Sequence, residues 1–344
     1  MRLLPPWRLL PLLAVVAGPA AADPPVRIRM AAEAPEGSAW AREFHAIDRD
    51  VQAGTKGRVQ MRWYLGGIAG DEVHTLDRIA KGQLDGEAGA LFCDKVAPSI
   101  RIGRIVGLFQ SRDEWRYVMS RLLPRLNAEA ARRGFTNPGV GSVGNIIFFS
   151  RRPLRTVDDL RTQRFWTWDL DDISRVMLEK MGLQMVPLPV ADAARAYDEG
   201  RVDGFVATPT AALVYQWSTR AHYYSPDLMV GELPACIVVA QRALDPLPIA
   251  DQDAVTAAIL RFVGRFEPIG RAEESSLLGG LFERQGLRRS VASVELRAHF
   301  IAAARAAREQ IAEKLVAKEL LAQTMTMLAD YRSERHELAP APSR

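Results

Sequence analysis

The sequence predicts an α/β protein, because segments with the pattern of strands alternate with segments with the pattern of helices along most of the chain. The strand-like segments are short and largely apolar or alternating, whereas the helix-like segments place apolar residues three or four positions apart. A second observation is one long amphipathic segment in the C-terminal half, from residue 251 to about residue 285. With 344 residues, the chain is also long enough for two domains of ordinary size.

The N-terminal half shows the alternation clearly. Residues 38–51 carry Trp40, Phe44, Ile47 and Val51 at helical spacing, and glycines break the chain directly after this segment. The elements predicted in this half are strands at 26–31, 59–64 and 86–91, a helix at 38–51, and a helix at 72–81 that ends at Gly82.

The C-terminal half repeats the strand–helix unit and then changes to long helices. Pro268 predicts a kink in the long amphipathic helix, and Ser293 is a suitable cap for a further helix that extends to about Tyr331. Residues 336–344 are polar and proline-rich, and we expect them to be a disordered tail. The other predicted elements are strands at 146–150, 164–168, 184–188 and 234–240, a helix from 157, and a helix at 173–181.

The N-terminus has the pattern of a cleavable secretory signal peptide. The chain opens with a short basic region that contains Arg2 and Arg8, and an apolar run follows from Leu9 to Gly18. Small residues then lead to a predicted cleavage site after Ala22. The apolar run is about half the length that spans a bilayer. We therefore predict a signal peptide at residues 1–22 and a periplasmic protein; the alternative is a buried N-terminal helix.

The charge balance indicates no polyanionic partner. The chain has 45 basic and 41 acidic residues, and without Arg2 and Arg8 the excess is two positive charges. The charges are scattered, and the small cluster at 151–155 is typical of a solvated turn before a helix. The composition therefore predicts no binding of nucleic acid.

The two cysteines, Cys93 and Cys236, would lie in an oxidising compartment where a disulfide can persist. Apolar residues flank both of them, and free cysteine behaves as a small buried hydrophobe. We favour two separate buried thiols, with a bridge as the alternative.

One glycine motif has the spacing of a dinucleotide-binding fingerprint. Gly139, Gly141 and Gly144 form G-x-G-x-x-G, but such a site needs a helix after the glycines, and residues 145–149 have the pattern of a strand. A glycine-rich crossing between lobes accounts for the motif better, since glycine tolerates unusual backbone angles.

No catalytic or metal-binding constellation is recognisable in the sequence. No serine lies in a G-x-S-x-G elbow, and the five histidines have no metal-ligand spacing. Asp169, Asp171 and Asp172 lack the glycine and spacing of a calcium loop, and carboxylates favour a helix N-terminus. We therefore predict a protein that is not an enzyme and has neither cofactor nor metal.

Six stretches in the same order resemble the solute-binding subunits of TRAP transporters, the DctP-type family. Each motif is weak by itself, but six in the right order are specific, and the resemblance covers about residues 26–335. The stretches are APEGSAW at 34–40, GRVQMRWYLGG with GDE between 57 and 72, GQLDG at 82–86, RTVDDL at 155–160, PLP at 187–189 and GRVDG at 200–204.

The resemblance implies two α/β lobes with mixed sheets, joined by crossing strands and by a long kinked helix, with the ligand between the lobes. It implies that residues 23–143 with 232–271 form lobe I, and that residues 144–231 with 272–335 form lobe II. It also implies a small-molecule ligand and the membrane subunits of a TRAP transporter as partners.

The sequence departs from the family at one position. In most of the family, the strand after the helix that resembles Asp159–Leu160 carries an arginine that pairs with a ligand carboxylate, a task that suits its planar fork. The matching position here is Trp166. In a strand, Trp166 and Trp168 point to one face. Either they form an apolar wall of the ligand cleft, which we favour, or they pack into the core of the lobe.

Further candidate ligand contacts come from the ends of the matching strands and from the turns after them. For each of these residues, a structural role is an equally good interpretation. The full set of candidate ligand-binding residues is Trp166, Trp168, Asp169, Glu33, Trp40, Asp71, Phe92, Asn145, Thr208, Tyr215 and Trp217.

The leading hypothesis is therefore a transporter-linked receptor for an uncharged, apolar or aromatic-compatible solute. One alternative keeps the transporter but has a carboxylate ligand held by another arginine, such as Arg164. Another is a sensory or scaffold role without a dedicated transporter.

Overall fold

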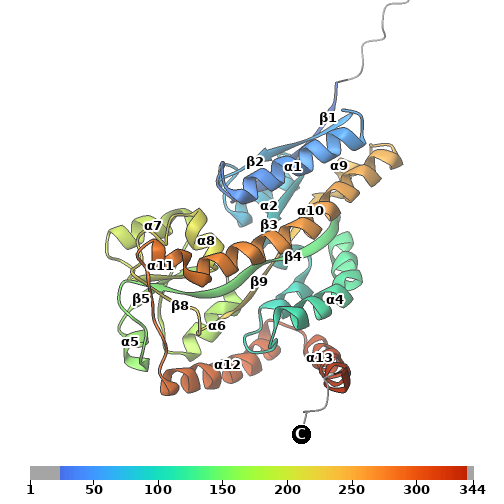
Figure 1. Ribbon diagram of the computed structural model, residues 1–344. Coiled ribbons are helices and arrows are strands. Elements are labelled where there is room, and N and C mark those ends of the chain that lie inside the picture. The colour runs from blue at the N-terminus through green and yellow to red at the C-terminus, as the bar shows by residue number, and fades with distance from the viewer. Residues whose placement is uncertain (1–23, 339–344) are drawn as a thin grey trace, which may run out of the picture.

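A computed structural model describes residues 24–338 of the chain (Figure 1). The predicted signal peptide lies outside the described residues, as does most of the predicted tail; the last helix includes residues 336–338. No helix between residues 24 and 338 is long and apolar enough to cross a membrane. The α/β class is confirmed, because helices separate most of the successive strands up to residue 240.

The first lobe is built on a five-stranded mixed sheet. Its strand order is β2-β1-β3-β9-β4. β1 runs parallel to β2 and β3, whereas β9 is antiparallel to β3 and to β4. These strands span Val26–Ala32 (β1), Val59–Tyr64 (β2), Gly86–Gly89 (β3), Phe135–Ser150 (β4) and Gly231–Ala240 (β9).

The second lobe uses the far half of β4. There the strand order is β4-β7-β5-β6, and β8 pairs with the other edge of β4 and with the short β10. β5 is parallel to β6 and β7. These strands span Arg164–Trp168 (β5), Gln184–Leu188 (β6), Gly204–Ala207 (β7), Tyr223–Ser225 (β8) and Arg288–Arg289 (β10).

The glycine motif lies inside β4, where this strand passes from one lobe to the other. The pairing of β4 with β9 shifts register between Thr136 and Gly139 and again between Ser142 and Gly144. No helix follows the glycines, so the phosphate site of a dinucleotide fold is absent from this segment. The long curved β4 links the lobes in Figure 1, in agreement with the predicted crossing.

Helices cover both lobes. In lobe I, α1 packs on β2 and α10, and α4 packs on β4; in lobe II, α6 packs on β6. Up to residue 244 the helices span Ala39–Gly54 (α1), Glu72–Ala80 (α2), Phe92–Val96 (α3), Pro98–Arg104 (η1), Arg112–Arg132 (α4), Val157–Arg161 (α5), Asp172–Lys180 (α6), Val190–Asp198 (α7), Pro209–Val214 (α8) and Gln241–Leu244 (α9).

The C-terminal helices differ from the prediction in where they break. α10 (Ile249–Ser276) contains Pro268 and packs against α1 of lobe I and α8 of lobe II. The helical path is interrupted after it, within Leu277–Leu281, because Gly280 adopts a φ of 119° that favours glycine. The expectation of one continuous helix to residue 285 was therefore wrong. The remaining short piece is α11 (Phe282–Arg284).

The last predicted helix is two helices. α12 (Val294–Lys314) packs against α6 of lobe II, and α13 (Lys318–Leu338) packs against α4 and η1 of lobe I. The chain turns between them without glycine or proline, so the sequence had no signal for this break. Because α13 returns to lobe I, the segment 272–335 is divided between the lobes (Figure 1).

The cysteines form a disulfide, so the expectation of two free thiols was wrong. Gly89 of β3 is paired with Cys236 of β9, and Cys93 follows β3 by four residues in α3. This pairing brings the two Cα atoms within 5.9 Å, although 143 positions separate the residues in the sequence. Sheet topology therefore decides the pairing.

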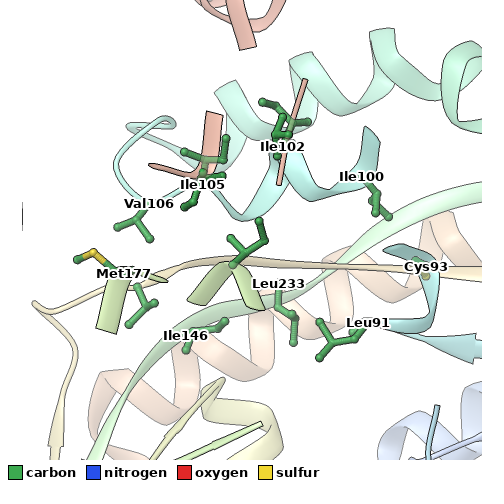
Figure 2. Packing of buried hydrophobic residues seen from close by; sticks show 14 of the residues in the cluster. Leu91, Cys93, Ile100, Ile102, Ile105, Val106, Ile146, Met177 and Leu233 are labelled. Carbon is green, nitrogen blue, oxygen red and sulfur yellow. The ribbon is translucent and has the colours of Figure 1, made fainter. Parts of the chain in front are cut away.

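The largest apolar cluster lies where η1 and the residues after it cover the crossing strands. Figure 2 shows Ile100, Ile102 and Ile105 together with Ile146 of β4 and Leu233 of β9 in this cluster. All five side chains are less than one tenth exposed. This packing supports the floor of the interlobe cavity, which Ile146 and Leu233 also line.

Candidate functional site

A cavity of about 160 Å³ lies between the two lobes. The carboxyl ends of the parallel strands β1 and β3 border it from lobe I, and those of β5 and β7 border it from lobe II. Ligands of open α/β sheets bind outside the carboxyl ends of the strands. Side chains of β4, β9 and α10 complete the lining. The cavity is therefore placed where both lobes can contact a solute.

The lining is mostly apolar and aromatic. Trp40 comes from α1, Phe262 and Phe266 from α10, and Tyr215 from the end of α8. Ring centroids of Trp40 and Phe266 lie 6.4 Å apart. Among the lining residues that the structure describes there is no arginine, lysine or histidine. The described lining therefore contains no group that could form an ion pair with a ligand carboxylate.

The tryptophans of β5 face the cavity side of their sheet. Trp166 is only 2% exposed, and its indole Nε1 donates a hydrogen bond to the Leu188 carbonyl oxygen at 2.9 Å. Trp168 is half-buried, and its Nε1 has no hydrogen-bond partner among the described residues. Phe165 points to the opposite face and packs edge-on against Phe148. Trp166 therefore belongs to both the cavity wall and the lobe core, while Trp168 has a free donor.

An aromatic stack supports this wall. Trp217 packs against Trp166 at a centroid distance of 4.8 Å, and lies stacked on Phe205 at 5.1 Å and on Tyr215 at 5.0 Å. The Tyr215 hydroxyl donates to the Glu33 backbone oxygen at 3.2 Å. This hydrogen bond connects lobe II with lobe I across the cavity.

Two glutamates of lobe I also line the cavity. Glu72 begins α2, is 4% exposed, and accepts a hydrogen bond from the Ala90 backbone N–H at 2.9 Å. It also accepts one from the Phe92 N–H. Burial raises the pKa of Glu72 to about 7, although these backbone donors favour its ionised form.

Glu33 directly follows β1, and its pKa is raised further than that of Glu72. Burial, with added repulsion from Glu72, Asp71 and Asp169, raises its pKa to about 9. Its buried Oε2 has no hydrogen-bond partner in the described part of the chain. A protonated carboxyl with a free oxygen therefore faces the cavity at neutral pH.

A third acid lies behind these two. Glu87 of β3 is 1% exposed and accepts a hydrogen bond from the Thr75 hydroxyl. Burial raises its pKa well above the usual range, with added repulsion from Glu72. Gly89 leaves room for this arrangement, since a Cβ at this position would lie 2.8 Å from Glu72 Oε1.

Seven of the eleven candidate residues predicted from the sequence line this cavity. They are Glu33, Trp40, Trp166, Trp168, Thr208, Tyr215 and Trp217.

The other four candidates lie outside the lining. Asp71 caps α2 by accepting from the His74 backbone N–H at 3.0 Å. Phe92 is buried edge-on against Phe135, and the Asn145 amide donates to Glu274 at 3.4 Å. Asp169 is close enough to Asp71 for repulsion to raise its pKa, in addition to burial.

Sequence reasoning missed several lining residues. The sequence predicts Glu72 only as the start of a helix, and it places Phe262 and Phe266 in the long amphipathic segment without marking them as site residues. Asp171 and Ser174 reach the cavity from the start of α6. The periodicity of a helical segment shows which of its faces is buried, but not that a cavity lies against that face. Within residues 24–338 no group of potential ligands could hold a metal ion.

The sequence profile of the bacterial extracellular solute-binding protein family 7 matches residues 30–318. The chain belongs to this family. A solute-binding protein of Chromohalobacter salexigens is 20% identical over 224 residues, which cover 62% of this chain and 64% of that relative. The chain thus aligns with slightly less than two thirds of this curated relative.

Solved structures of the family share the fold. A TRAP periplasmic solute-binding protein of Desulfovibrio desulfuricans with bound sn-glycerol-3-phosphate has a TM-score of 0.80 at 17% identity, covering 89% of this chain and 97% of that one. One from Xanthobacter autotrophicus with bound β-D-galacturonate has a TM-score of 0.78 at 19% identity, covering 88% and 98%. An extracytoplasmic solute receptor of Bordetella pertussis that binds pyroglutamic acid has a TM-score of 0.79 at 16% identity, covering 87% and 99%. The predicted two-lobed periplasmic binding fold is confirmed.

Proposed function

We propose that this family 7 protein is the periplasmic receptor of a TRAP-type transporter, and that it captures a small solute with an apolar or aromatic-compatible body and without a carboxylate anchor. The observation that carries this proposal is the absence of any basic side chain from the described cavity lining. Galacturonate, glycerol-3-phosphate and pyroglutamate, the ligands of the three similar structures, all carry acidic groups. A buried acidic group here would lose its hydration without gaining a cationic partner.

The alternative carboxylate site at Arg164 has little support. Arg164 is exposed, forms an ion pair with Asp203 at 3.2 Å and donates to the Gly200 carbonyl oxygen at 2.6 Å. It does not line the cavity. We therefore expect Arg164→Ala to leave solute affinity unchanged.

Interlobe contacts support a receptor that closes on its solute. Arg101 of η1 contacts Asp172 of α6 at 3.3 Å, and Arg104 contacts Asp171 at 3.8 Å. The Tyr215–Glu33 hydrogen bond connects the lobes on the cavity side. A solute that touches both lobes would favour this closed arrangement over an open one.

Native mass spectrometry of protein purified from the periplasm without denaturation tests the proposal. We expect a retained small molecule that lacks carboxylate and phosphate groups and that is released on unfolding. Calorimetry with the released compound should then show binding that Trp168→Ala weakens about tenfold, since the indole contributes apolar area to the cavity. A retained sugar acid or other simple carboxylate would contradict the proposal.

A further inference from the structure

We infer that the solute is an organic cation, with one positively charged nitrogen held against Glu33 and an apolar body held by the aromatic wall of the cavity. This inference rests on the proposed function, because it names the chemical class of the solute that the interlobe cavity receives. The cavity volume of about 160 Å³ is close to that of apolar cavities that hold one benzene-sized molecule. The solute is accordingly small.

The first argument is that two of the three acids in the described lining of the cavity, Glu33 and Glu72, lack counterions, whereas the third, Asp171, lies 3.8 Å from Arg104. Within residues 24–338, every buried aspartate and glutamate except Glu72 and Glu87 has an arginine partner. Partly buried Glu33 has none either. We call Glu33, Glu72 and Glu87 the unpaired acids. Burying an ionised acid without a counterion costs free energy. We therefore assign the role of the missing cation to the solute.

The second argument is the geometry of Glu33. Its Oε2 is buried at the cavity and accepts no hydrogen bond from any described residue. A buried acceptor without a donor costs free energy that a ligand N–H or an adjacent cation recovers. By contrast, the two oxygens of Glu72 accept from the backbone N–H groups of Ala90 and Phe92. Glu33 is therefore the carboxyl group available to a ligand.

The third argument is the aromatic lining that shares the cavity with Glu33 and Glu72. Trp40, Trp168, Tyr215 and Phe266 all line the cavity. The face of an aromatic ring attracts a cation by its quadrupole, most strongly where water is excluded. An aromatic wall beside an unpaired carboxylate favours a cation over a neutral solute and disfavours an anion.

Proton release follows from this arrangement and makes it testable. Because the pKa of Glu33 is about 9 in the free protein, a permanent cation must displace its proton to form the ion pair. Affinity for such a cation therefore rises about tenfold per pH unit below about pH 9. The acidic and phenolic groups that face or neighbour Glu33 are Glu72, Asp71, Glu87, Asp169 and Tyr215.

The test uses three probes of similar size that differ in charge. Choline is a permanent cation, 3,3-dimethylbutan-1-ol is its uncharged counterpart, and 3,3-dimethylbutanoate is an anion with the same branched body. Calorimetry on the full chain, freed of retained solute, compares them between about pH 6.5 and 8.5. We expect choline to bind best at the upper pH, with affinity that rises about tenfold per unit and with release of one proton. The alcohol should bind more weakly and independently of pH.

Glu33→Gln keeps the shape of the side chain but removes its charge. We expect it to weaken choline binding at least tenfold at pH 8.5, to remove the pH dependence between about pH 7.5 and 8.5, above the pKa of about 7 of Glu72, and to leave affinity for the alcohol within about threefold. Glu36→Gln, which removes the same charge from a side chain that is 70% exposed, is the matched control and should behave like the wild type.

The outcomes separate this inference from the proposed function. Equal affinity for choline and the alcohol at every pH, or no choline binding at millimolar concentration, overturns the organic cation and leaves the apolar solute standing. Tightest binding of 3,3-dimethylbutanoate overturns both. Choline binding that Glu33→Gln does not change overturns the role of Glu33.

Discussion

Two acidic regions of the protein differ in how their charges are balanced. Around η1 and α4, Arg101 and Arg104 neutralise Asp94, while Arg112 lies 3.0 Å from Glu232 and also contacts Glu274. At and behind the cavity, the unpaired acids have no such partners among residues 24–338. The paired region has its counterions within the protein, whereas the unpaired acids are balanced only by protons or by a ligand.

The comparison shows that the same residue type serves two purposes according to its neighbours. Burial raises the pKa of Asp94, but the charges of Arg104 and Arg101 oppose this rise. At Glu33 the neighbouring charges are negative and act in the same direction as burial. The first arrangement holds segments of the fold in place, and the second keeps a carboxyl group neutral until a cation arrives.

The largest expected effect breaks the paired region. Arg104 is 1% exposed and contacts both Asp94 and Asp171, so Arg104→Met would leave two buried acids without this partner. We expect a loss of about 3–5 kcal/mol in the free energy of unfolding at pH 7, measured by urea titration. Arg195→Met, which removes an arginine that is 66% exposed, should change stability by less than about 1 kcal/mol. A loss for Arg104→Met as small as that of the control would contradict this assignment.

The second prediction concerns Glu33 in the free protein. Its pKa is about 9 when folded and 4.5 as an ordinary glutamate, so the folded state binds more protons between these values. Its contribution to stability is therefore complete below about pH 4.5 and is lost as pH rises toward about 9. Glu33→Gln should stabilise the free protein by about 1–3 kcal/mol at pH 8 and by much less at pH 5.

Urea titrations of the wild type and Glu33→Gln at both pH values measure this difference. Glu36→Gln again serves as the control, and it should show no such dependence on pH. The prediction fails if the difference in unfolding free energy between Glu33→Gln and the wild type is the same at pH 5 and pH 8.

The third prediction concerns the packing of Gly89 against the Glu72 carboxyl group. A Cβ on Gly89 would lie 2.8 Å from Glu72 Oε1 and 2.9 Å from its Cδ, so Gly89→Ala must displace this carboxyl group from its backbone donors. We expect a loss of about 1–3 kcal/mol in unfolding free energy. Gly264→Ala, on an open face of α10, should instead be neutral or slightly stabilising. Thermal melts of both variants test the contrast.

The smallest effect concerns the contact between the lobes. Tyr215→Phe removes the hydrogen bond to the Glu33 carbonyl oxygen, which is worth about 0.5–1.5 kcal/mol. Solute affinity should fall about two- to tenfold, and small-angle scattering should show a larger radius of gyration for the free protein. Tyr223→Phe, on β8 away from the cavity, should change neither quantity.

Much of the local structure was predictable, because periodicity reflects which face of a segment is buried. The strands at 59–64, 164–168 and 184–188 have the predicted bounds, and α2 ends before Gly82 as expected. The helix breaks near Gly280 and residue 315 were missed. The second of these has no local signal, because packing of α13 against α4 decides it.

The site was predictable in part for a related reason. Residues at the ends of parallel strands were expected to meet, and Glu33, Trp168 and Thr208 do line one cavity. Glu72 and Phe266 were missed as site residues, because their sequence patterns are those of an ordinary helix start and an ordinary apolar stripe. Whether such a residue faces a core or a cavity depends on what packs against it.

The sequence by itself determined the α/β alternation, the apolar character of the site and the lack of arginine at position 166. Each of these depends on residue type and short-range order. Only the tertiary structure decided that Cys93 bonds to Cys236, and that Glu33 and Glu72 share a cavity whose described lining has no basic residue. The physical reason is that counterions and bonding partners are neighbours in space, contributed by segments that the sheet order brings together from distant parts of the chain.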